Sequence, residues 1–279
     1  MMGNWANRPE YQVNRTSISM TTSASSTLLS LERISLSFKG VKAITDISFE
    51  VDAGEICALI GPNGAGKSSL LNVINGVYRP QHGTVCFDGH AHRRMNPYHA
   101  AHSGIARTFQ NIALFRRMSV LDNVLTGRNL HRRSTWLEQT LRVGRARRDE
   151  AAQRRYAEVV IEALDLQRYR HSTVGMLAYG VQKRVELARA LAAEPRLLLL
   201  DEPMAGMNAE EKAALAGCIA DANTQFGVTV VLIEHDIGVV MDLADHVVVL
   251  DYGRKIADGS PAEVRTSPDV LAAYLGTRH

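Results

Sequence analysis

The chain has 279 residues, of which 46% are hydrophobic and 22% charged, and its formal net charge is +3 at pH 7. This length and balance are those of a folded globular protein with one large core or two smaller ones. The small net charge gives no argument for binding to nucleic acid. No apolar stretch approaches the roughly 18 to 20 residues that a membrane-spanning helix needs.

The N-terminal part of the chain changes character near residue 27. Residues 1–26 are polar and lack the apolar segment of a secretory signal, so we expect a disordered extension on a cytoplasmic protein. Apolar and other residues then alternate over residues 34–38 and 47–51, which is the period of half-buried strands, and we expect these two strands to be antiparallel. Residues 56–60 are uniformly apolar, so a buried parallel sheet is expected to begin there.

An alternation of helices and strands follows. Apolar residues at helical spacing predict a helix over residues 70–77, with Gly76 and Pro80 as its stop signals. Further strands are expected at residues 197–200, 228–233 and 246–250, and helices at about residues 185–193 and 210–223. Residues 111–176 contain no strand-like run and are expected to be helical. The pattern predicts an α/β fold with a mainly parallel sheet.

The segment between the first buried strand and the helix after it fits the pattern G-x-x-x-x-G-K-[ST]. It reads Gly61, Pro62, Asn63, Gly64, Ala65, Gly66, Lys67 and Ser68, and Ser69 follows. Glycines permit a tight turn that points backbone N–H groups at phosphates, while Lys67 adds a positive charge and Ser68 a ligand for Mg²⁺. A chance glycine turn is the alternative, but the flanking strand and helix favour a phosphate loop (residues 61–69) that binds ATP with Mg²⁺.

Two carboxylates end the predicted strand at residues 197–200, where ligands gather at the carboxyl ends of parallel strands. Asp201 is suited to hold Mg²⁺ through water, and Glu202 to take the proton from an attacking water as a general base. Taken alone, the segment also fits a solvated acidic turn before Pro203. The phosphate loop upstream favours a nucleotide-hydrolysing site.

One further segment separates this chain from other nucleotide hydrolases. It reads Leu177, Ala178, Tyr179, Gly180, Val181 and Gln182, and a helix follows it. The order of phosphate loop, this segment and the acidic strand end resembles that of ABC ATPases, from Leu29 to about Asp258. The resemblance implies a P-loop NTPase core with an antiparallel β subdomain and a helical subdomain. It also implies a dimer with a second ATPase subunit, in which each nucleotide lies between one phosphate loop and the other subunit's signature segment (residues 177–182).

The signature segment departs from the family's Leu-Ser-Gly-Gly-Gln. Ala178 replaces the serine, Tyr179 a glycine and Val181 the first glutamine, whereas Gly180 and Gln182 remain. Ala178 offers no side-chain hydrogen bond, so phosphate contacts must come from backbone N–H groups at the helix start. A simple helix-opening turn is the alternative for this segment alone.

The resemblance assigns roles to other positions. Gln110 is implied to contact Mg²⁺ and to link the nucleotide site to the membrane partner, and His235 to be the switch histidine that reaches the terminal phosphate. Phe38 stands where an aromatic ring packs on adenine, although an ordinary core phenylalanine is the alternative. Residues 205–208 stand where the dimer-contact loop lies, with Asn208 in place of the usual aspartate.

Several segments more closely resemble an ATPase subunit of bacterial branched-chain amino-acid importers, and importers of urea or short amides share much of the pattern. These segments are residues 177–180, 205–208, 234–241 and 268–276. The resemblance implies an ATPase domain over residues 27–260, with a helical subdomain at about 111–190, and a C-terminal helical tail over 261–279. Its implied partners are transmembrane permease subunits and, through the complex, a solute-binding protein. The implied location is the cytoplasmic face of the cell membrane, as a peripheral subunit.

Rival interpretations remain at this point. An ABC ATPase of translation or DNA repair would work without a membrane partner, but such proteins usually carry two ATPase domains or a long coiled coil. A small-molecule kinase would have no use for the signature segment. Residues 128–155 carry nine arginines against three acidic residues, which fits a solvated helical face better than contact with anionic lipid. The three cysteines lack metal-binding spacing, so free thiols are expected.

Overall fold

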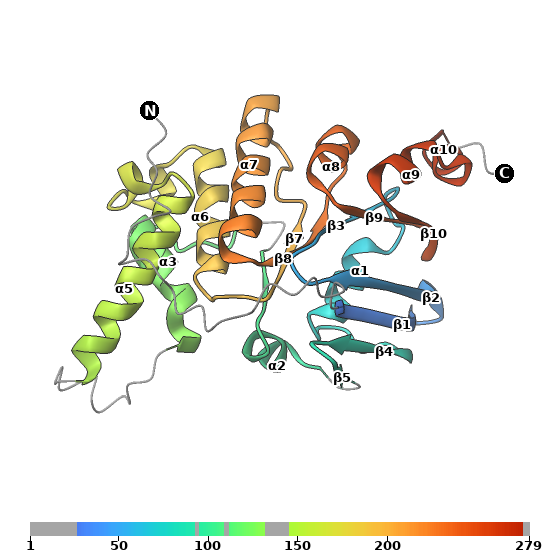
Figure 1. Ribbon diagram of the computed structural model, residues 1–279, viewed down its shortest axis with the longest axis horizontal. Coiled ribbons are helices and arrows are strands. Elements are labelled where there is room, and N and C mark those ends of the chain that lie inside the picture. Colours follow the sequence, from blue (N-terminus) through green and yellow to red (C-terminus); the bar gives the residue numbers. More distant parts are fainter. Residues whose placement is uncertain (1–26, 93–94, 109–111, 132–144, 276–279) are drawn as a thin grey trace, which may run out of the picture.

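The computed structural model describes residues 27–92, 95–108, 112–131 and 145–275, which fold into two sheets covered by helices (Figure 1). The predicted disordered extension, Gln110 and the last four residues of the predicted tail lie outside these ranges. None of the helices in the described part of the chain is long and apolar enough to cross a membrane.

The first sheet is antiparallel, with the strand order β2-β1-β4-β5. Its strands are β1 (Thr27–Phe38), β2 (Val41–Asp52), β4 (His82–Phe87) and β5 (His90–His92). Alternate residues of β1 and β2 are buried because only one face of this sheet packs against the core. The prediction of two antiparallel strands is confirmed.

The second sheet has the strand order β10-β9-β3-β8-β7-β6 and is parallel except for its β9-β10 pair. Its strands are β3 (Ile56–Ile60), β6 (Ile105–Arg107), β7 (Leu197–Asp201), β8 (Thr229–Ile233), β9 (His246–Asp251) and β10 (Arg254–Gly259). Every residue of β3, β7 and β8 is buried, since both faces of the sheet are covered. The predicted α/β fold with a mainly parallel sheet is confirmed.

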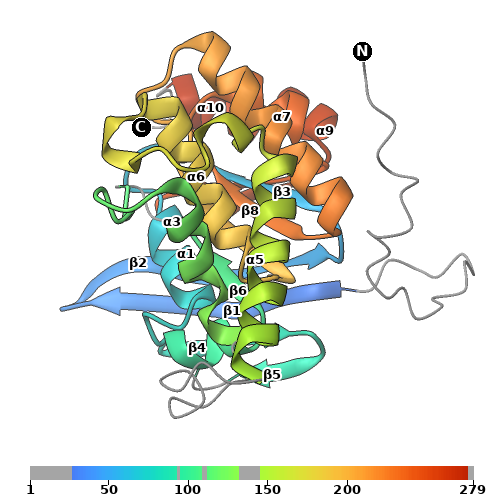
Figure 2. The same ribbon diagram turned by 90° about the vertical axis from the view of Figure 1, so that its left-hand side faces the viewer.

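The helices cover the second sheet on both faces (Figures 1 and 2). They are α1 (Lys67–Ile74), α2 (Pro97–His102), α3 (Val120–Gly127), α5 (Arg145–Ala163), α6 (Tyr179–Leu191), α7 (Ala209–Phe226), α8 (Ile237–Leu243), α9 (Pro261–Thr266) and α10 (Pro268–Leu275). Helix α1 shares a core with both sheets, α3 and α5 to α7 share a second core with β7 and β8, and α8 to α10 a third with β3 and β9. Alternate residues of each central strand therefore point to different cores.

The helix after the phosphate loop is shorter than predicted. It ends at Ile74, and Val77 lies beyond it with 48% of its surface exposed. Gly76 adopts a left-handed φ of 72°, and the N–H groups of Val77 and Tyr78 both donate to the Asn72 carbonyl oxygen. The glycine therefore ends the helix before Val77 can join its apolar face.

Part of the arginine-rich stretch is buried and not solvated. The Arg128 side chain is 6% exposed, pairs with Glu194 at 2.5 Å and lies over the Tyr156 ring at 4.2 Å. Arg154 and Arg155 on α5 are exposed. The interpretation of a solvated face therefore holds for those two arginines and is wrong for Arg128. The three cysteines are free, as predicted.

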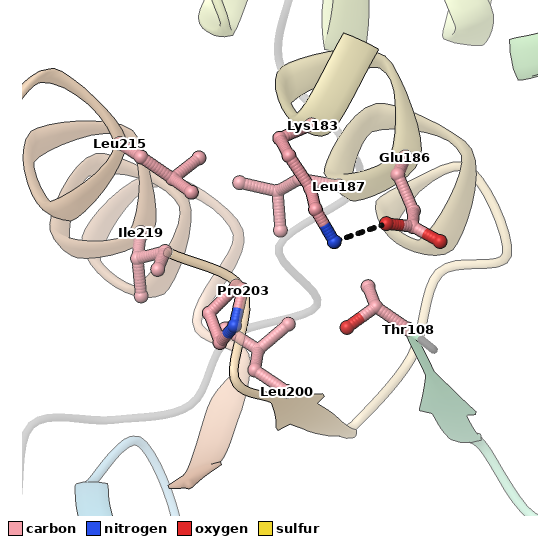
Figure 3. Close-up of a pocket in the computed structure, with 8 residues that line it drawn as sticks. All are labelled: Thr108, Lys183, Glu186, Leu187, Leu200, Pro203, Leu215 and Ile219. Carbon is pink, nitrogen blue, oxygen red and sulfur yellow. Dashed lines mark hydrogen bonds and ion pairs between the residues drawn. The ribbon is translucent and has the colours of Figure 1, made fainter. Parts of the chain in front are cut away.

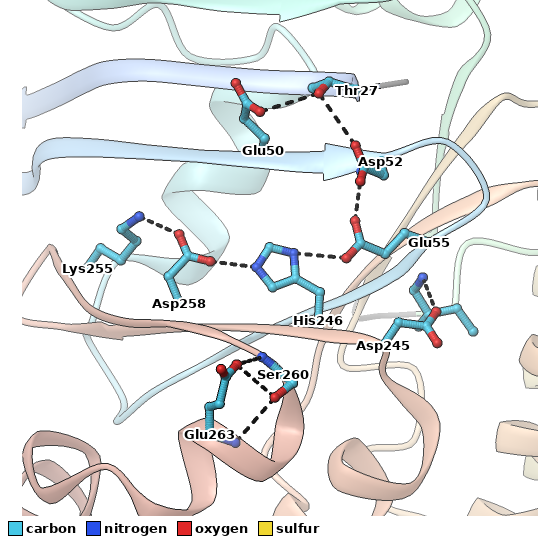
Figure 4. A network of polar contacts seen from close by, with 11 residues as sticks. Thr27, Glu50, Asp52, Glu55, Asp245, His246, Lys255, Asp258, Ser260 and Glu263 are labelled. Carbon is cyan, nitrogen blue, oxygen red and sulfur yellow. Dashed lines mark hydrogen bonds and ion pairs between the residues drawn. The ribbon is translucent and has the colours of Figure 1, made fainter. Parts of the chain in front are cut away.

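A charged histidine joins the strands at the end of the sheet opposite the phosphate loop (Figure 4). His246 Nδ1 lies 3.1 Å from Glu55 Oε1 and His246 Nε2 lies 2.5 Å from Asp258 Oδ1, so one ring connects β9 to β10 and to the residue just before β3. The hydrogen bonds to Asp258, Cys57 and Glu55 outweigh the effect of burial and raise the pKa of His246 to about 12. The imidazolium form is therefore held in the folded protein.

This pKa shift predicts how stability depends on pH. Because the folded state raises the pKa of His246 above its ordinary value of 6.5, the stabilisation is complete below that value and is lost as the pH rises toward the folded-state pKa. Urea unfolding of wild type and His246→Gln should show a stability difference that shrinks by roughly 1 kcal/mol per pH unit between pH 7 and 9. A difference that stays constant over that range would contradict the proposed charge state.

Candidate functional site

The phosphate loop connects β3 to α1, and two of its glycines are required by their surroundings. Gly61 has a φ of 143°, and a Cβ there would lie 2.0 Å from the Leu250 carbonyl oxygen. Gly66 is the N-cap of α1 with a φ of 100°, and a Cβ there would lie 2.6 Å from the Ala43 carbonyl oxygen. The Gly253 N–H donates to the Ala65 carbonyl oxygen at 3.1 Å. The turn between β9 and β10 therefore fixes the phosphate loop through a backbone hydrogen bond.

The lysine of the loop is buried within it. Lys67 is 6% exposed, and its Nζ donates to the carbonyl oxygens of Gly61 at 2.7 Å and Pro62 at 3.0 Å. Burial lowers the pKa of Lys67, while the carboxylates of Glu202 and Asp201 act in the opposite direction. The positive charge of Lys67 is thus placed between the loop backbone and the acidic end of β7.

Asp201 is the last residue of β7 and is held by an arginine that the sequence did not single out. Arg107 Nη2 lies 2.8 Å from Asp201 Oδ2, and Arg107 Nη1 donates to Asn72 Oδ1 at 2.5 Å. The side chains of Arg107 and Asp201 are only 9% and 8% exposed. The guanidinium group therefore ties the edge strand β6 to α1 and to the carboxylate that is predicted to hold Mg²⁺.

Glu202 and His235 lie beside each other at the carboxyl ends of β7 and β8. His235 Nε2 is 2.8 Å from Glu202 Oε1. Glu202 adopts a left-handed φ of 49°, and its N–H donates to the Ile233 carbonyl oxygen at 3.0 Å. A non-glycine residue with this φ is uncommon, and such conformations gather at functional sites. This arrangement presents a carboxylate base next to an imidazole at the edge where Lys67 lies.

The oxygen donors at this edge suit a hard divalent cation. Ser68 is exposed in the first turn of α1 and offers a hydroxyl oxygen. Asp201 offers a carboxylate, and Arg107 contacts its Oδ2 atom. Hydroxyl and carboxylate oxygens are the ligands that Mg²⁺ prefers, and it commonly keeps waters and takes further ligands from phosphates. The residues present therefore fit Mg²⁺ that arrives with ATP.

The signature segment opens α6 on another part of the molecule. Ala178 is the exposed N-cap of α6 and makes no side-chain capping bond, while Gln182 Nε2 donates to the Leu177 carbonyl oxygen at 2.7 Å. Strands β7 and β8 lie between α6 and α1 in Figure 1. Among the hydrogen bonds and ion pairs of the described residues, none joins the signature segment to the phosphate loop. That a nucleotide lies between this loop and the signature segment of a second subunit stays a prediction.

The signature segment also contacts the dimer-contact loop. The Tyr179 hydroxyl donates to the Ala205 carbonyl oxygen at 3.2 Å, and Tyr179 is 42% exposed. Asn208 ends the loop by capping α7, where its side chain accepts a hydrogen bond from the Glu211 N–H at 2.9 Å. The Asn208 that replaces aspartate therefore performs a normal capping role.

Helix α6 holds the segment that follows residues 109–111. Glu186 Oε1 accepts a hydrogen bond from the Ala113 N–H at 3.4 Å, and Arg189 Nη1 donates to the Ala113 carbonyl oxygen. Lys183 Nζ lies 3.3 Å from Glu186 Oε2, and both side chains are 2% exposed (Figure 3). The space beside this pair measures about 10 Å³, which is room for one water at most. It is therefore a structural ion pair and not a ligand pocket.

Phe38 is not a core residue. It is 41% exposed, and its ring packs edge-on against Tyr78 with the centroids 5.0 Å apart. The alternative of an ordinary core phenylalanine is wrong, and contact with adenine stays a prediction. Gln110 lies outside the described residues, so its contact with Mg²⁺ also stays a prediction.

Comparisons with known proteins agree with this geometry. The family model described as ABC transporter matches residues 44–205, and the model described as branched-chain amino acid ATP-binding cassette transporter matches residues 254–279. The chain is 37% identical over 249 residues to the high-affinity branched-chain amino acid transport ATP-binding protein BraF of Pseudomonas aeruginosa, covering 89% of this chain and 98% of that protein. It is 35% identical, with the same coverage, to LivG of Escherichia coli, which carries the same description.

Solved structures agree as well. The ADP conformation of an ATP-binding cassette of an ABC transporter matches with a TM-score of 0.79 at 30% identity, covering 90% of this chain and all of that one. A nucleotide-free ATP-binding cassette from an ABC transporter matches with a TM-score of 0.77, also at 30% identity, covering 89% of this chain and 99% of that one. The predicted ABC ATPase fold and the resemblance to branched-chain amino-acid transport ATPases are confirmed. The chain belongs to the ABC transporter family, as one of its ATP-binding and ATP-hydrolysing subunits.

Proposed function

We propose that this ATPase subunit powers the import of branched-chain amino acids through a membrane permease. The observation that carries the hydrolytic role is the Glu202–His235 pair at 2.8 Å, beside Lys67 at the carboxyl ends of the parallel strands. The solute is inferred from the match of residues 254–279 and from the names of BraF and LivG. We place the subunit on the cytoplasmic face of the membrane, because the cell supplies ATP there.

In this proposal each site residue has a separate task. The N–H groups of the phosphate loop and Lys67 bind the phosphates, and Phe38 packs on the base. Ser68 and Asp201 hold Mg²⁺, which supplies positive charge to the phosphate oxygens when bound. Glu202 accepts the proton of the attacking water, while His235 orients the Glu202 carboxylate and donates toward the terminal phosphate.

The facing subunit completes each site in our proposal. In the site that this chain completes for its partner, backbone N–H groups at the start of α6 take the place of the serine hydroxyl that Ala178 lacks. They can do so because the first turn of a helix leaves N–H groups unpaired and carries partial positive charge. In this chain Ala178, Tyr179, Gly180 and Gln182 form that surface. Ala178 and Tyr179 are exposed at the helix start, which supports the assignment, while the buried Gln182 holds the Leu177 carbonyl oxygen.

A charge substitution tests the signature surface. Gly180→Asp would place a carboxylate beside Glu211, whose Oε1 lies 3.1 Å from the position of an added Cβ, and would direct a negative charge at a facing phosphate. We expect about 100-fold slower ATP hydrolysis by the assembled transporter, since such like-charge contacts cost several kcal/mol. Gly217→Asp is the matched control, because Gly217 is exposed on α7 with open space around it. Equal hydrolysis by both variants would reject the assignment.

A groove beside β6 is the proposed docking site for the permease. It has a volume of about 200 Å³ and is lined by mostly apolar residues, among them Pro97, Ile105, Leu130 and Pro195. Leu130 is 44% exposed, and Arg107, which holds Asp201, also lines the groove. A permease segment bound here would thus lie one side chain away from the proposed Mg²⁺ ligand.

Copurification from solubilised membranes tests the partner. A tagged wild-type chain should retain integral membrane proteins, and Leu130→Asp should lose them because a charge in the groove core would be desolvated without a partner. Leu271→Asp is the control, since Leu271 is 50% exposed on α10 away from the groove lining. Retention of RNA in place of membrane protein would favour the soluble ABC ATPase instead.

A further inference from the structure

Glu234 is a buried carboxylate that none of the proposed roles uses. It lies directly after β8 and directly before His235, with 4% of its surface exposed. Its Oε1 accepts a hydrogen bond from the Met204 N–H at 2.8 Å, and its Oε2 accepts one from the His235 N–H at 3.2 Å. One side chain therefore bridges the backbone of two different turns.

These two turns carry the side chains that hydrolysis needs. Met204 follows Glu202 by two residues, in a turn where the Ala205 N–H donates to the Glu202 carbonyl oxygen at 3.2 Å. The regular pairing of β7 with β8 ends at Asp201 and Ile233, and the Glu202 N–H adds a bond to Ile233. Beyond that point the Glu234 carboxylate joins the backbone of the two turns, and the Glu202–His235 contact joins their side chains.

A side chain with two acceptor oxygens is well suited to this position. Two backbone N–H groups approach the two oxygens of one carboxylate, which is the arrangement that favours the ionised form. Burial nevertheless raises the pKa of Glu234 above its ordinary value, with Glu202 acting in the same direction, and the bonds from Met204 and His235 offset only part of this effect. An apolar side chain of the same size would leave the Met204 N–H buried without this acceptor, and Met204 itself is fully buried.

We propose that Glu234 is a positioning residue for ATP hydrolysis, which sets the separation between the Glu202 carboxylate and the His235 imidazole by holding both turns through their backbone N–H groups. The proposal rests on the proposed roles of Glu202 and His235. It also connects the dimer-contact loop to the hydrolytic pair, because Met204 immediately precedes Ala205. Movement of that loop would reach the His235 backbone through the Glu234 carboxylate, in addition to the direct contact between Glu202 and the His235 ring.

The test compares Glu234→Gln and Glu234→Ala with wild type in the complex captured through a tag on the full-length chain. Glutamine keeps one acceptor oxygen but brings an NH₂ group against the second N–H, and alanine removes both bonds. We expect kcat to fall about 10-fold for glutamine and up to about 100-fold for alanine, because a displacement of about 1 Å in a catalytic group can cost that much. Nucleotide affinity should stay within about twofold of wild type, since the two oxygens of Glu234 bond to the backbone of Met204 and His235 and not to the phosphate loop.

Thr229→Val is the matched control. Thr229 is buried at the opposite end of the same strand, and its Oγ1 accepts a hydrogen bond from the Gly54 N–H at 2.8 Å. The substitution removes a side-chain bond to backbone of the same kind, away from the site. It should lower stability to urea while leaving kcat unchanged. If Thr229→Val lowered kcat as much as Glu234→Gln, the effect of Glu234 would be general stability and the proposal would be overturned.

A double-mutant comparison separates this inference from the proposed function. If Glu234 acts by setting the separation of Glu202 and His235, then Glu234→Ala should lower kcat clearly less in the His235→Ala background than in wild type, because residues that act as a unit are not additive. Independent, multiplicative losses would overturn the positioning role. Full turnover by the His235→Ala variant itself would instead reject the proposed function. If His235→Ala lost ATP turnover while both Glu234 variants kept it in full, the positioning role of Glu234 would be rejected and the proposed function would stand.

Discussion

Glu202→Gln is expected to bind nucleotide with wild-type affinity and to lose ATP turnover by about 100-fold or more, the range by which a positioned general base commonly contributes. Glutamine has nearly the shape of glutamate and can keep the contact with His235 Nε2, which is 2.8 Å away. It cannot take a proton from water. The left-handed backbone of Glu202 is unchanged by this substitution, so the fold should be retained.

Two measurements check this expectation. Binding of a fluorescent ATP analogue reports affinity, and phosphate release by the assembled transporter reports turnover. Glu210→Gln is the matched control, because Glu210 is exposed in the first turn of α7 and makes no contact with the proposed pair. If Glu202→Gln released phosphate as fast as Glu210→Gln, the general base would have to be another group.

Lys67→Ala is expected to act on binding. The Lys67 ammonium lies within the phosphate loop, where it donates to the Gly61 and Pro62 carbonyl oxygens, and its removal would take a positive charge away from the proposed phosphate site. A charge-assisted hydrogen bond of this kind contributes about 2 kcal/mol, which corresponds to roughly 30-fold in Kd. Lys67→Ala should therefore raise the Kd for ATP by that factor or more.

Lys255→Ala provides the comparison for Lys67→Ala. Lys255 pairs with Asp258 on β10, so the variant loses a lysine and an ion pair without touching the loop. Isothermal titration with ATP and Mg²⁺ should leave its affinity at the wild-type value. Equal affinities of the two variants would mean that Lys67 does not contact the phosphates.

The parallel strands and the phosphate loop were predictable because each has a recognisable pattern over a few consecutive residues. The parallel strands are uniformly apolar because helices cover both faces, and the phosphate loop needs glycine where a Cβ would meet Leu250 or Ala43 backbone oxygens. The three-residue strands β5 and β6 were missed, since three residues cannot show an alternation. The six-residue strands β4 and β10 were also missed, because β4 is buried only near its end and β10 contains no fully buried residue. The helix end at Ile74 was misplaced because the apolar spacing continues through Val77, past the glycine that stops the helix.

The contacts that complete the site were beyond the reach of a sequence pattern. Arg107 and Asp201 are 94 positions apart, and no sequence motif or repeat of apolar residues predicts that they pair. The same is true of the hydrogen bond from the Ala113 N–H to Glu186 on α6, since these two residues are 73 positions apart. Glu234 lies within the sequence that suggested the subgroup, yet only the fold shows that its two oxygens bridge Met204 and His235.

Uptake of labelled leucine tests the central claim most directly. Cells whose only copy of this chain carries Glu202→Gln are compared with wild type and with Glu210→Gln, after equal amounts of the three proteins are verified. The proposed function predicts that leucine uptake is lost in Glu202→Gln cells and retained in the other two. Leucine uptake at the wild-type rate by Glu202→Gln cells would contradict it, and labelled urea or a short amide would then be the next solute to measure.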